Sequence, residues 1–272
     1  MIMGLGTQMI AWPDELCQDI ADRGFYVIRF DNRDVGLSTH LNDKRAPKIA
    51  DLILKRANPP YKISDMAADA VGLLDALNID SAHMVGASMG GFIAQMIAGL
   101  YPERVRSLTL IMTSTGSRLV GYPKPQLFTK LLRRRIVQDQ AEAMDAVIEM
   151  FRIIGSRGYA FDEDYLRDLA GRSYQRAYDP GGYLRQLAAS VAQGNRTRHL
   201  RNIKVPTLVM HGLSDPLVNA SGGKALAKAI PGAEFLGFQG MGHDLPRELW
   251  PRFADEICAV ADRGEVRRRA SA

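Results

Sequence analysis

Short apolar runs alternate with stretches of helical periodicity along most of this chain, and this alternation constrains its fold more than any other feature. The apolar runs cover Phe25–Asp31, His83–Val85, Leu108–Met112, Thr207–Met210 and Glu234–Phe238. A strand followed by a turn and an amphipathic helix is typical of parallel βαβ units. The sequence therefore predicts an α/β fold, with a mostly parallel sheet and helices on both faces.

Helix signals lie between these runs. Ser64 is the expected N-cap of one helix, because the residues after it carry apolar side chains at helical spacing. A second helix is predicted over Met89–Leu100, where Pro102 follows its end. Further helices are predicted over Trp12–Arg23 and roughly Glu248–Ala261.

The composition sets the class of protein. With 272 residues, 46% hydrophobic and 24% charged, the chain resembles an average globular protein, which excludes a disordered, collagen-like or coiled-coil chain. Cys17 and Cys258 are too few to form a disulfide framework. We expect two free thiols in a reducing compartment, and hence a cytoplasmic protein.

The strand pattern disappears between Thr115 and Ile203. Helices are predicted there over Gln126–Val137, Ala141–Ile154, Glu163–Tyr178 and Gly182–Gln193. Residues 1–114 and 204–263 would then form the core and residues 115–203 a helical cap over the carboxyl edge of the sheet, where open α/β folds bind ligands. The basic tail, residues 264–272, is predicted to be disordered.

The net charge of +5 is concentrated in Arg133–Arg135 and Arg267–Arg269. Few aromatic residues lie among these arginines and no nucleic-acid-binding module is recognisable, so a solvated surface is predicted rather than a nucleic-acid partner.

No signal peptide is evident at the start. Residues 83–100 lack charged side chains, yet their glycines and serine fit a strand and a helix better than a membrane span.

The start of the chain predicts an incomplete strand. Met1–Met3 are followed by a Gly-rich turn and then by the helix predicted from Trp12, so only three residues remain for a strand. A short strand would leave hydrogen-bonding groups of longer neighbours unpaired. We therefore expect that strands of the complete sheet are missing before Met1, and that an upstream segment would supply them.

Residues 86–90 match the pattern G-x-S-x-G, and their position matters more than the match. The pentapeptide follows the strand at His83–Val85 and opens the helix at Met89, which is the context of a nucleophile elbow. Such a turn brings the residues two before and two after Ser88 close together, so Gly86 and Gly90 would avoid a clash.

A serine hydroxyl needs a base to act as a nucleophile, and the base needs an orienting carboxylate. Of five histidines, His243 follows the last predicted strand, and Asp215 follows the strand before it. Both would project from the same carboxyl edge as Ser88, in the chain order serine, aspartate, histidine that is typical of one class of hydrolase. Asp244 is a weaker candidate because adjacent residues seldom align a carboxylate with the neighbouring ring.

Acyl transfer also needs two hydrogen-bond donors for the negative charge that develops on the carbonyl oxygen. The backbone N–H of Met89, at the start of a helix, is one candidate. The turn Gly4–Gly6 follows the first strand fragment, and we nominate the N–H of Leu5 as the second donor.

These residues together resemble the α/β-hydrolase superfamily. The resemblance extends from Met3 to Ala261 and rests on residues 3–6 with Trp12-Pro13, on residues 31–38, on residues 86–91 and on residues 240–244. They are similar to the esterase and lipase-like branch that includes aclacinomycin methylesterase. The resemblance implies the α/β-hydrolase fold with a helical cap, a carboxylic ester as small-molecule substrate, no cofactor and no metal, and Ser88, Asp215 and His243 as a catalytic triad.

Other functions remain open at this point. The same superfamily contains proline iminopeptidase-like peptidases, cofactor-free haloperoxidases or perhydrolases, and hydrolase-fold receptors with little turnover. Epoxide hydrolases and dehalogenases are disfavoured, because they use an aspartate where this chain has Ser88. The sequence also leaves open whether the protein forms a homodimer.

Overall fold

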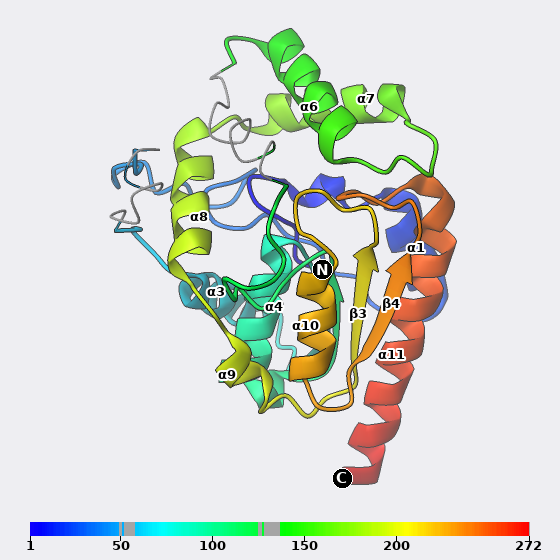
Figure 1. Cartoon of the computed structure of the whole chain (residues 1–272). Coiled ribbons are helices and arrows are strands. Elements are labelled where there is room, and N and C mark those ends of the chain that lie inside the picture. Colours follow the sequence, from blue (N-terminus) through cyan, green and yellow to red (C-terminus); the bar gives the residue numbers. More distant parts are fainter. Residues whose placement is uncertain (49–50, 52–57, 125–126, 128–136, 272) are drawn as a thin grey trace.

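A computed structural model describes residues 1–48, 51, 58–124, 127 and 137–271. Among these residues the named strands form one parallel sheet in the order β1 (Ala82–Ala87), β2 (Val105–Ile111), β3 (Thr207–Gly212) and β4 (Glu234–Phe238). The strands all end at the same edge, which lies at the top of Figure 1. The predicted α/β class, with its parallel sheet, is confirmed.

The first residues of the chain extend this sheet beside β1. Ile2 forms parallel bridges with Gly86 and with Phe30, and its N–H donates to the carbonyl of Val85 over 2.8 Å. The predicted strand over residues 25–31 is wrong, because among these residues only Phe30 takes part in β-pairing. The segment at residues 25–31 lies beside the start of the chain, which pairs with it only through Ile2. A single bridge of this kind is too short a ladder to define a strand.

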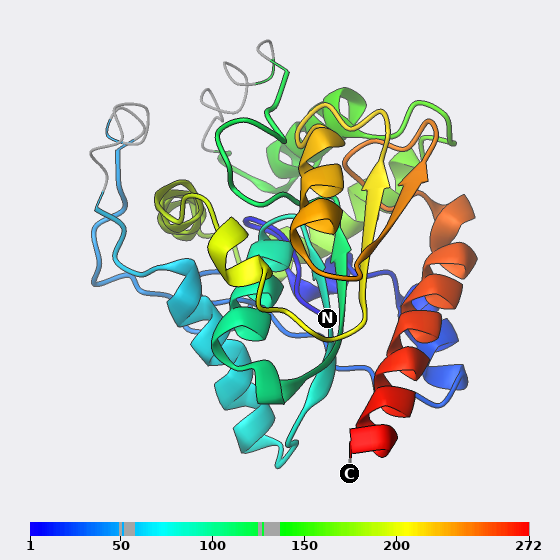
Figure 2. The same ribbon diagram turned by 60° about the horizontal axis from the view of Figure 1, so that its bottom comes forward.

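Helices cover both faces of the sheet, as predicted. On one face lie α3 (Ile63–Ala76), α4 (Met89–Leu100) and α10 (Ser221–Ala229), and on the other lie α1 (Asp14–Asp22) and α11 (Trp250–Ser271) (Figures 1 and 2). Two hydrophobic clusters fill the two interfaces.

Successive strand residues contribute to opposite clusters. Met84 and Leu110 pack in the cluster beside α3 and α4, whereas the residues that follow them, Val85 and Ile111, pack in the cluster beside α1 and α11. This alternation follows from the pleat of a strand, and it explains why the runs are apolar on both sides. Short 3₁₀ turns at Met9–Ala11, Pro102–Arg104 and Arg247–Leu249 connect the larger elements.

The helix predicted behind Ser64 is present, but Ser64 does not cap it. The helix starts at Ile63, one residue before Ser64, and the preceding Lys62 is the N-cap residue. The carboxylate of Asp65 accepts the N–H of Lys62 over 2.7 Å, so a first-turn aspartate stabilises this end instead of a capping hydroxyl.

The tail predicted to be disordered from Gly264 is instead helical as far as Ser271, as the end of α11. Glu265 explains why the helix continues, since its carboxylate accepts from Arg106 over 2.9 Å and lies 3.1 Å from Nε2 of His83. Gly264 packs against the carbonyl of Arg106. These contacts with β1 and β2 stabilise the helical conformation of the tail, although the tail has no apolar stripe of its own.

The insertion between β2 and β3 contains α6 (Gln140–Ile154), α7 (Glu163–Arg176), α8 (Pro180–Ala192) and α9 (Thr197–Leu200). The first three agree with the predicted helices to within two residues at each end, whereas the helix predicted at 126–137 lies almost wholly outside the described residues. Helices α6 and α7 lie beyond the carboxyl ends of β3 and β4 (Figure 1).

The uncharged stretch at residues 83–100 forms β1, Ser88 and α4. Among the described helices, none is long and apolar enough for a bilayer span. Cys17 and Cys258 are both free thiols, as predicted.

Candidate active site

Ser88 occupies the single-residue turn between β1 and α4. Its backbone has φ 54° and ψ −116°, a conformation that side-chain-bearing residues rarely adopt. Its N–H donates to the carbonyl of Ile111 over 2.9 Å, and its own carbonyl accepts from the hydroxyl of Thr113 over 2.7 Å. These bonds to β2 and its end hold the strained turn, which presents the Ser88 hydroxyl at the carboxyl edge of the sheet.

The glycines around Ser88 allow the backbone to pack closely. A Cβ on Gly86 would lie 2.4 Å from the carbonyl oxygen of Gly90, which is the clash that the pattern predicts. A Cβ on Gly90 would meet the carbonyl oxygen of Ile2 at 2.1 Å. Gly90 therefore makes room for the first residues of the chain rather than for Gly86.

His243 and Asp215 complete a chain of hydrogen bonds from Ser88. Nε2 of His243 lies 3.0 Å from Oγ of Ser88, and Nδ1 of His243 lies 2.7 Å from Oδ2 of Asp215. Because a carboxylate only accepts, Nδ1–H donates to Asp215 and Nε2 is left to accept from the Ser88 hydroxyl. Asp215 is 2% exposed and His243 8% exposed, so water hardly competes for these bonds.

The loop after β3 carries Asp215 and the loop after β4 carries His243. The backbones of these two loops are in direct contact, which brings the two side chains together. Ser214 donates its N–H to the carbonyl of Met241 over 3.0 Å. A Cβ on Gly212, the last residue of β3, would lie 2.4 Å from the carbonyl oxygens of Met241 and Gly242. The glycine at this strand end therefore lets the His243 loop reach Asp215.

Asp215 is held by its own turn as well as by His243. Its Oδ1 accepts the N–H groups of Leu217 and Val218, each over 2.8 Å. The carboxylate thus serves as an Asx-turn acceptor with one oxygen and contacts the imidazole with the other. His211, fully buried, donates from Nε2 to the carbonyl of Val218 over 2.8 Å, and burial lowers its pKa.

All five histidines lie in described residues, and His243 is the one that contacts Ser88. His40 lies between Asp179 and the carbonyl of Gly36. His83 contacts Ser107 and Glu265, and His199 is exposed on α9. Asp244 points to Ser156 rather than to the imidazole of its neighbour His243.

The turn predicted to supply the second oxyanion donor lies against Ser88. A Cβ on Gly4 would be 3.2 Å from the Cβ of Ser88. Within the described part of the chain, the N–H groups of Leu5 and Met89 have no protein acceptor. The next N–H, on Gly6, donates to Oε1 of Gln186 over 2.8 Å. Two free amides near the Ser88 hydroxyl are what an oxyanion site requires.

Sequence reasoning missed several side chains that hold this site. Thr113 directly follows a predicted strand and therefore lies at the same edge of the sheet as Ser88. That position could have indicated a contact with the Ser88 turn. Gln186 on α8 also donates from Nε2 to the carbonyl of Arg33 over 2.7 Å, so it joins the Gly4–Gly6 turn to the loop after Phe30. No local pattern in an insertion helix reports such a contact.

One group of side chains could offer metal ligands, since ligand atoms of Asp34, His40 and Asp179 lie within 4.8 Å of one another. Arg185 already occupies this cluster. Its guanidinium donates to both oxygens of Asp34, over 2.7 and 2.9 Å, and to Asp179 over 3.0 Å. Burial tends to raise the pKa of Asp34, but the hydrogen bonds from Arg185, the Leu41 N–H and Tyr61, with the charge of Arg185, together outweigh it and lower the pKa. The guanidinium of Arg185 thus balances part of the negative charge of Asp34 and Asp179.

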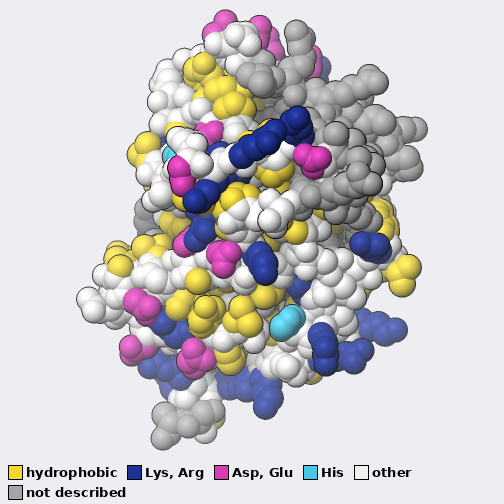
Figure 3. Space-filling view, turned by 90° about the vertical axis from the view of Figure 1, so that its left-hand side faces the viewer, with side chains coloured by type: hydrophobic (Ala, Val, Ile, Leu, Met, Phe, Trp, Pro, Cys, Tyr) yellow, Lys and Arg dark blue, Asp and Glu magenta, His cyan; other side chains and the backbone are white. Residues whose placement is uncertain are grey.

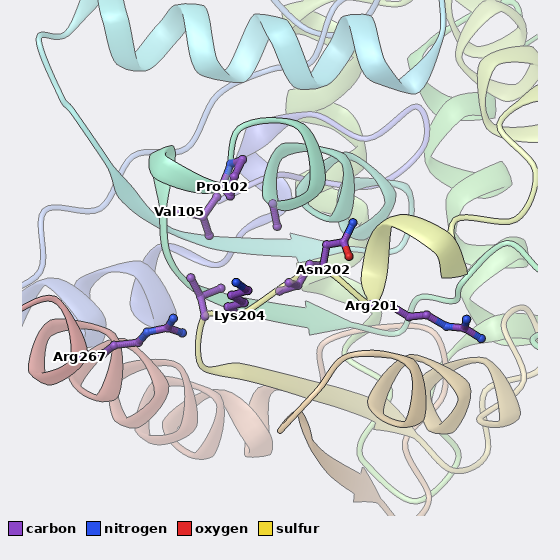
Figure 4. Close-up of a pocket in the computed structure, with 9 residues that line it drawn as sticks. Pro102, Val105, Arg201, Asn202, Lys204 and Arg267 are labelled. Carbon is purple, nitrogen blue, oxygen red and sulfur yellow. The ribbon is translucent and has the colours of Figure 1, made fainter. Parts of the chain in front are cut away.

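A pocket of about 490 Å³ lies at the opposite edge of the sheet. It borders Pro102 and Val105, where β2 begins, and carries Arg201, Lys204 and Arg267 around its rim (Figure 4). The end of the molecule away from the carboxyl edge of the sheet lies at the bottom of the space-filling view, where Lys and Arg side chains also gather (Figure 3). Because Ser88 follows the carboxyl end of β1, this basic pocket is separate from the candidate active site.

Comparison with known proteins shows which fold family this chain resembles. A model of the alpha/beta hydrolase fold matches residues 1–246. The chain is 28% identical to the rhodomycin D methylesterase DauP of Streptomyces sp. (strain C5), over 95% of this chain and 89% of that protein. It is 33% identical to the 2-hydroxymuconate semialdehyde hydrolase of Pseudomonas sp. (strain CF600), over 77% of this chain and 73% of that protein. An enol-lactonase structure from Burkholderia xenovorans LB400 has the same fold, with a TM-score of 0.71 at 23% identity over 95% of this chain and 88% of that one.

Proposed function

Because this chain belongs to the α/β-hydrolase family, we propose that it is a serine hydrolase that cleaves carboxylic esters through an acyl-enzyme intermediate. In this proposal Ser88 is the nucleophile, His243 the general base and acid, and Asp215 the carboxylate that orients the imidazole. The backbone N–H groups of Leu5 and Met89 form the oxyanion hole.

The observation that carries the proposal is the contact of 3.0 Å between Nε2 of His243 and Oγ of Ser88. It matters because Ser88 stands in a strained turn with a positive φ at the amino end of α4, and residues strained in this way cluster at active sites. A nucleophile and its base within hydrogen-bond reach, with the base held by a third group, are typical of nucleophilic catalysis.

Acylation follows from this arrangement. His243 accepts the proton of the Ser88 hydroxyl as Oγ attacks the ester carbonyl carbon, and Asp215 stabilises the imidazolium that forms. The negative charge on the former carbonyl oxygen is then shared by the Leu5 and Met89 amides. Collapse of this intermediate breaks the bond to the alcohol oxygen, which takes the proton from His243 and leaves.

Deacylation repeats the steps with water. His243 accepts a proton from a water molecule that attacks the acyl carbon, and the second tetrahedral intermediate uses the same two amides. When it collapses, the bond to Ser88 breaks, Oγ recovers its proton from His243, and the carboxylic acid is released. The cycle consumes one ester and one water and needs no cofactor.

We propose methyl esters of bulky acids as the first substrate class to examine, since a relative over nearly the whole chain is a methylesterase. The insertion of residues 115–203 would act as a cap over the site and would set the acyl specificity. Its helices α6 and α7 lie beyond the strand ends from which Ser88, Asp215 and His243 project, which supports this role.

A second candidate is hydrolysis of a carbon–carbon bond next to a carbonyl group. The 2-hydroxymuconate semialdehyde hydrolase of Pseudomonas sp. (strain CF600), at 33% identity over 77% of this chain, favours it. The discriminating substrate pair is a methyl ester of an aromatic acid and a vinylogous 1,5-diketone acid of similar size. Ester hydrolysis predicts faster turnover of the first, and a higher kcat/KM for the diketone would overturn the ester assignment.

The direct test combines covalent labelling with turnover. A fluorophosphonate probe should label one site per chain at Ser88, and a short-chain nitrophenyl ester should be hydrolysed by the wild type. Labelling without turnover of any ester in a panel graded by chain length would favour a receptor. Preferential cleavage of an amino-terminal proline amide would favour the peptidase alternative, and formation of a peracid from a carboxylic acid and hydrogen peroxide would favour the perhydrolase alternative. Absence of both labelling and turnover would overturn the proposal.

A further inference from the structure

The loop that carries His243 is fastened to the insertion by a set of hydrogen bonds. The N–H of His243 donates to the carbonyl of Ile154, the last residue of α6, over 2.7 Å. Two residues later, the N–H of Ser156 donates to Oδ2 of Asp244 over 3.0 Å, and its hydroxyl donates to Oδ1 of the same carboxylate. The Ser156 hydroxyl also accepts the N–H of Gly242 over 2.9 Å. We call the Ser156, Gly242 and Asp244 contacts the Ser156–Asp244 clasp.

The two backbones touch without intervening side chains. A Cβ on Gly242 would lie 2.4 Å from the carbonyl oxygen of Gly155, and one on Gly158 would lie 2.7 Å from the Cα of Gly240. The N–H of Gly158 donates to the carbonyl of Gly240 over 3.0 Å. A shift of the segment after α6 is therefore transmitted directly to the loop that holds His243.

The clasp fixes both neighbours of His243. Gly242 is held through its N–H, which donates to the Ser156 hydroxyl, and Asp244 through its carboxylate, which accepts from both the hydroxyl and the backbone N–H of Ser156. The Ser156 hydroxyl donates and accepts at once, which defines its orientation. Burial raises the pKa of the Asp244 carboxyl, although the donors of Ser156 counteract that effect.

We propose that Ser156 and Asp244 are positioning residues that set the distance from the His243 imidazole to the Ser88 hydroxyl. The proposal rests on the proposed function, because it assigns His243 the role of base. It adds that the insertion shapes the catalytic geometry itself, in addition to covering the substrate. Displacement of a catalytic group by about 1 Å can cost on the order of 100-fold in rate, whereas substrate contacts made elsewhere remain.

The test measures kcat, KM and the rate of inactivation by a fluorophosphonate for Ser156→Ala, Asp244→Asn and the double variant, with a short-chain nitrophenyl ester as substrate. Ser156→Ala is expected to lower kcat and the inactivation rate by about 10- to 100-fold and to leave KM within about threefold. The double variant should lose little more than Ser156→Ala, because both substitutions break the same clasp. Ser156→Thr keeps the hydroxyl and should restore most of the rate.

Ser190→Ala is the matched control. Ser190 lies on α8 in the same insertion, and its hydroxyl donates only within the helix, to the carbonyl of Gln186 over 3.0 Å. We expect its kinetic constants to equal those of the wild type. Thermal unfolding of each variant shows whether it is folded at the assay temperature.

The outcomes separate the two proposals. Ser156→Ala and Asp244→Asn proteins that are folded and keep the wild-type kcat and inactivation rate would overturn the positioning role while leaving the hydrolase assignment intact. A lower melting temperature with unchanged kcat would also overturn it, since it would show a contribution to stability alone. If Ser156→Ala does not fold, Asp244→Asn and Ser156→Thr decide the question by the same criteria. A wild-type protein that neither reacts with the probe nor hydrolyses the ester would show both proposals to be wrong.

Discussion

The side chain of Gln186 accepts a hydrogen bond of 2.8 Å from the N–H of Gly6, although 180 residues separate the two. Gln186 is fully buried and belongs to helix α8 of the insertion, whereas Gly6 ends the turn whose preceding residue, Leu5, is the proposed second oxyanion donor. One amide side chain of the insertion thus fixes the turn that the proposed mechanism uses for charge stabilisation.

Replacing Gln186 should therefore impair catalysis more than substrate binding. Gln186→Ala leaves the partly buried N–H of Gly6 and carbonyl of Arg33 without their partner, which costs about 1 kcal/mol of stability for each bond. We expect kcat for a nitrophenyl ester to fall about 10-fold, as the Leu5 amide loses its fixed direction. Gln175→Ala, on the exposed side of α7, is the control. Unchanged kcat in a folded Gln186→Ala protein would contradict the role.

Removing the Ser88 hydroxyl should abolish almost all activity. Ser88→Ala is expected to lower kcat by about 10⁴–10⁶-fold and to prevent fluorophosphonate labelling, because no other group replaces the nucleophile. Steady-state turnover and mass spectrometry of the labelled protein measure the two effects. A Ser88→Ala protein that keeps most of its esterase activity would require a different nucleophile.

Asp215→Asn should leave the fold largely intact but reduce kcat by about 10⁴-fold. The amide oxygen of Asn can still accept from Leu217 and Val218, so the turn survives. Its NH₂ group cannot accept from Nδ1 of His243, which favours the wrong tautomer of the imidazole. Circular dichroism checks the fold and steady-state kinetics the rate, and a loss below about tenfold would argue against Asp215 as the orienting carboxylate.

The stability contributed by His40 should depend on pH. Burial tends to lower its pKa, but the carbonyl of Gly36 and the carboxylate of Asp179, with Asp34 nearby, outweigh burial and raise it. Arg185 also contacts both carboxylates and stays charged throughout. A raised pKa means that the folded protein binds the proton more tightly than the unfolded chain. The added stability is therefore complete below the unfolded pKa and is lost as the pH rises through the folded pKa.

Urea unfolding of wild type and His40→Gln at two pH values measures this effect. The difference in unfolding free energy should be larger at about pH 5.5 than at about pH 8.5. A difference that is the same at both pH values would contradict the raised pKa, because it would show that folding leaves the pKa of His40 unchanged.

Substitutions of two glycines should have opposite effects on stability. Gly90→Ala places a methyl group 2.1 Å from the carbonyl oxygen of Ile2, and backbone atoms cannot move aside cheaply, so we expect a loss of about 3 kcal/mol or more. Gly72→Ala, on the exposed side of α3 with no atom within 4 Å of the new Cβ, should gain about 0.5–1 kcal/mol. Chemical denaturation measures both, and a Gly90→Ala protein as stable as the wild type would contradict the close approach of Ile2.

Features that depend on neighbours in the chain could be predicted from the residues alone. Strand periodicity followed by a G-x-S-x-G turn predicted β1, Ser88 and α4, because the stereochemistry of that turn is a property of residues 86–90. The positions of Asp215 and His243 after later strands predicted that they share an edge with Ser88, since parallel strands end together. Local patterns also predicted α6, α7 and α8.

The contacts between these elements depend on how the folded layers pack. Gln186 and Ser156 stand in or beside insertion helices that no spacing rule connects with Gly6 or Asp244, and packing between distant segments brings them together. The same reason accounts for two predictions that were wrong. Residues 25–31 lack a long pairing partner, and residues 264–271 stay helical because Glu265 binds Arg106 on β2. Hydrogen bonds between remote residues depend on how whole layers pack, and a pattern of nearby residues does not encode that packing.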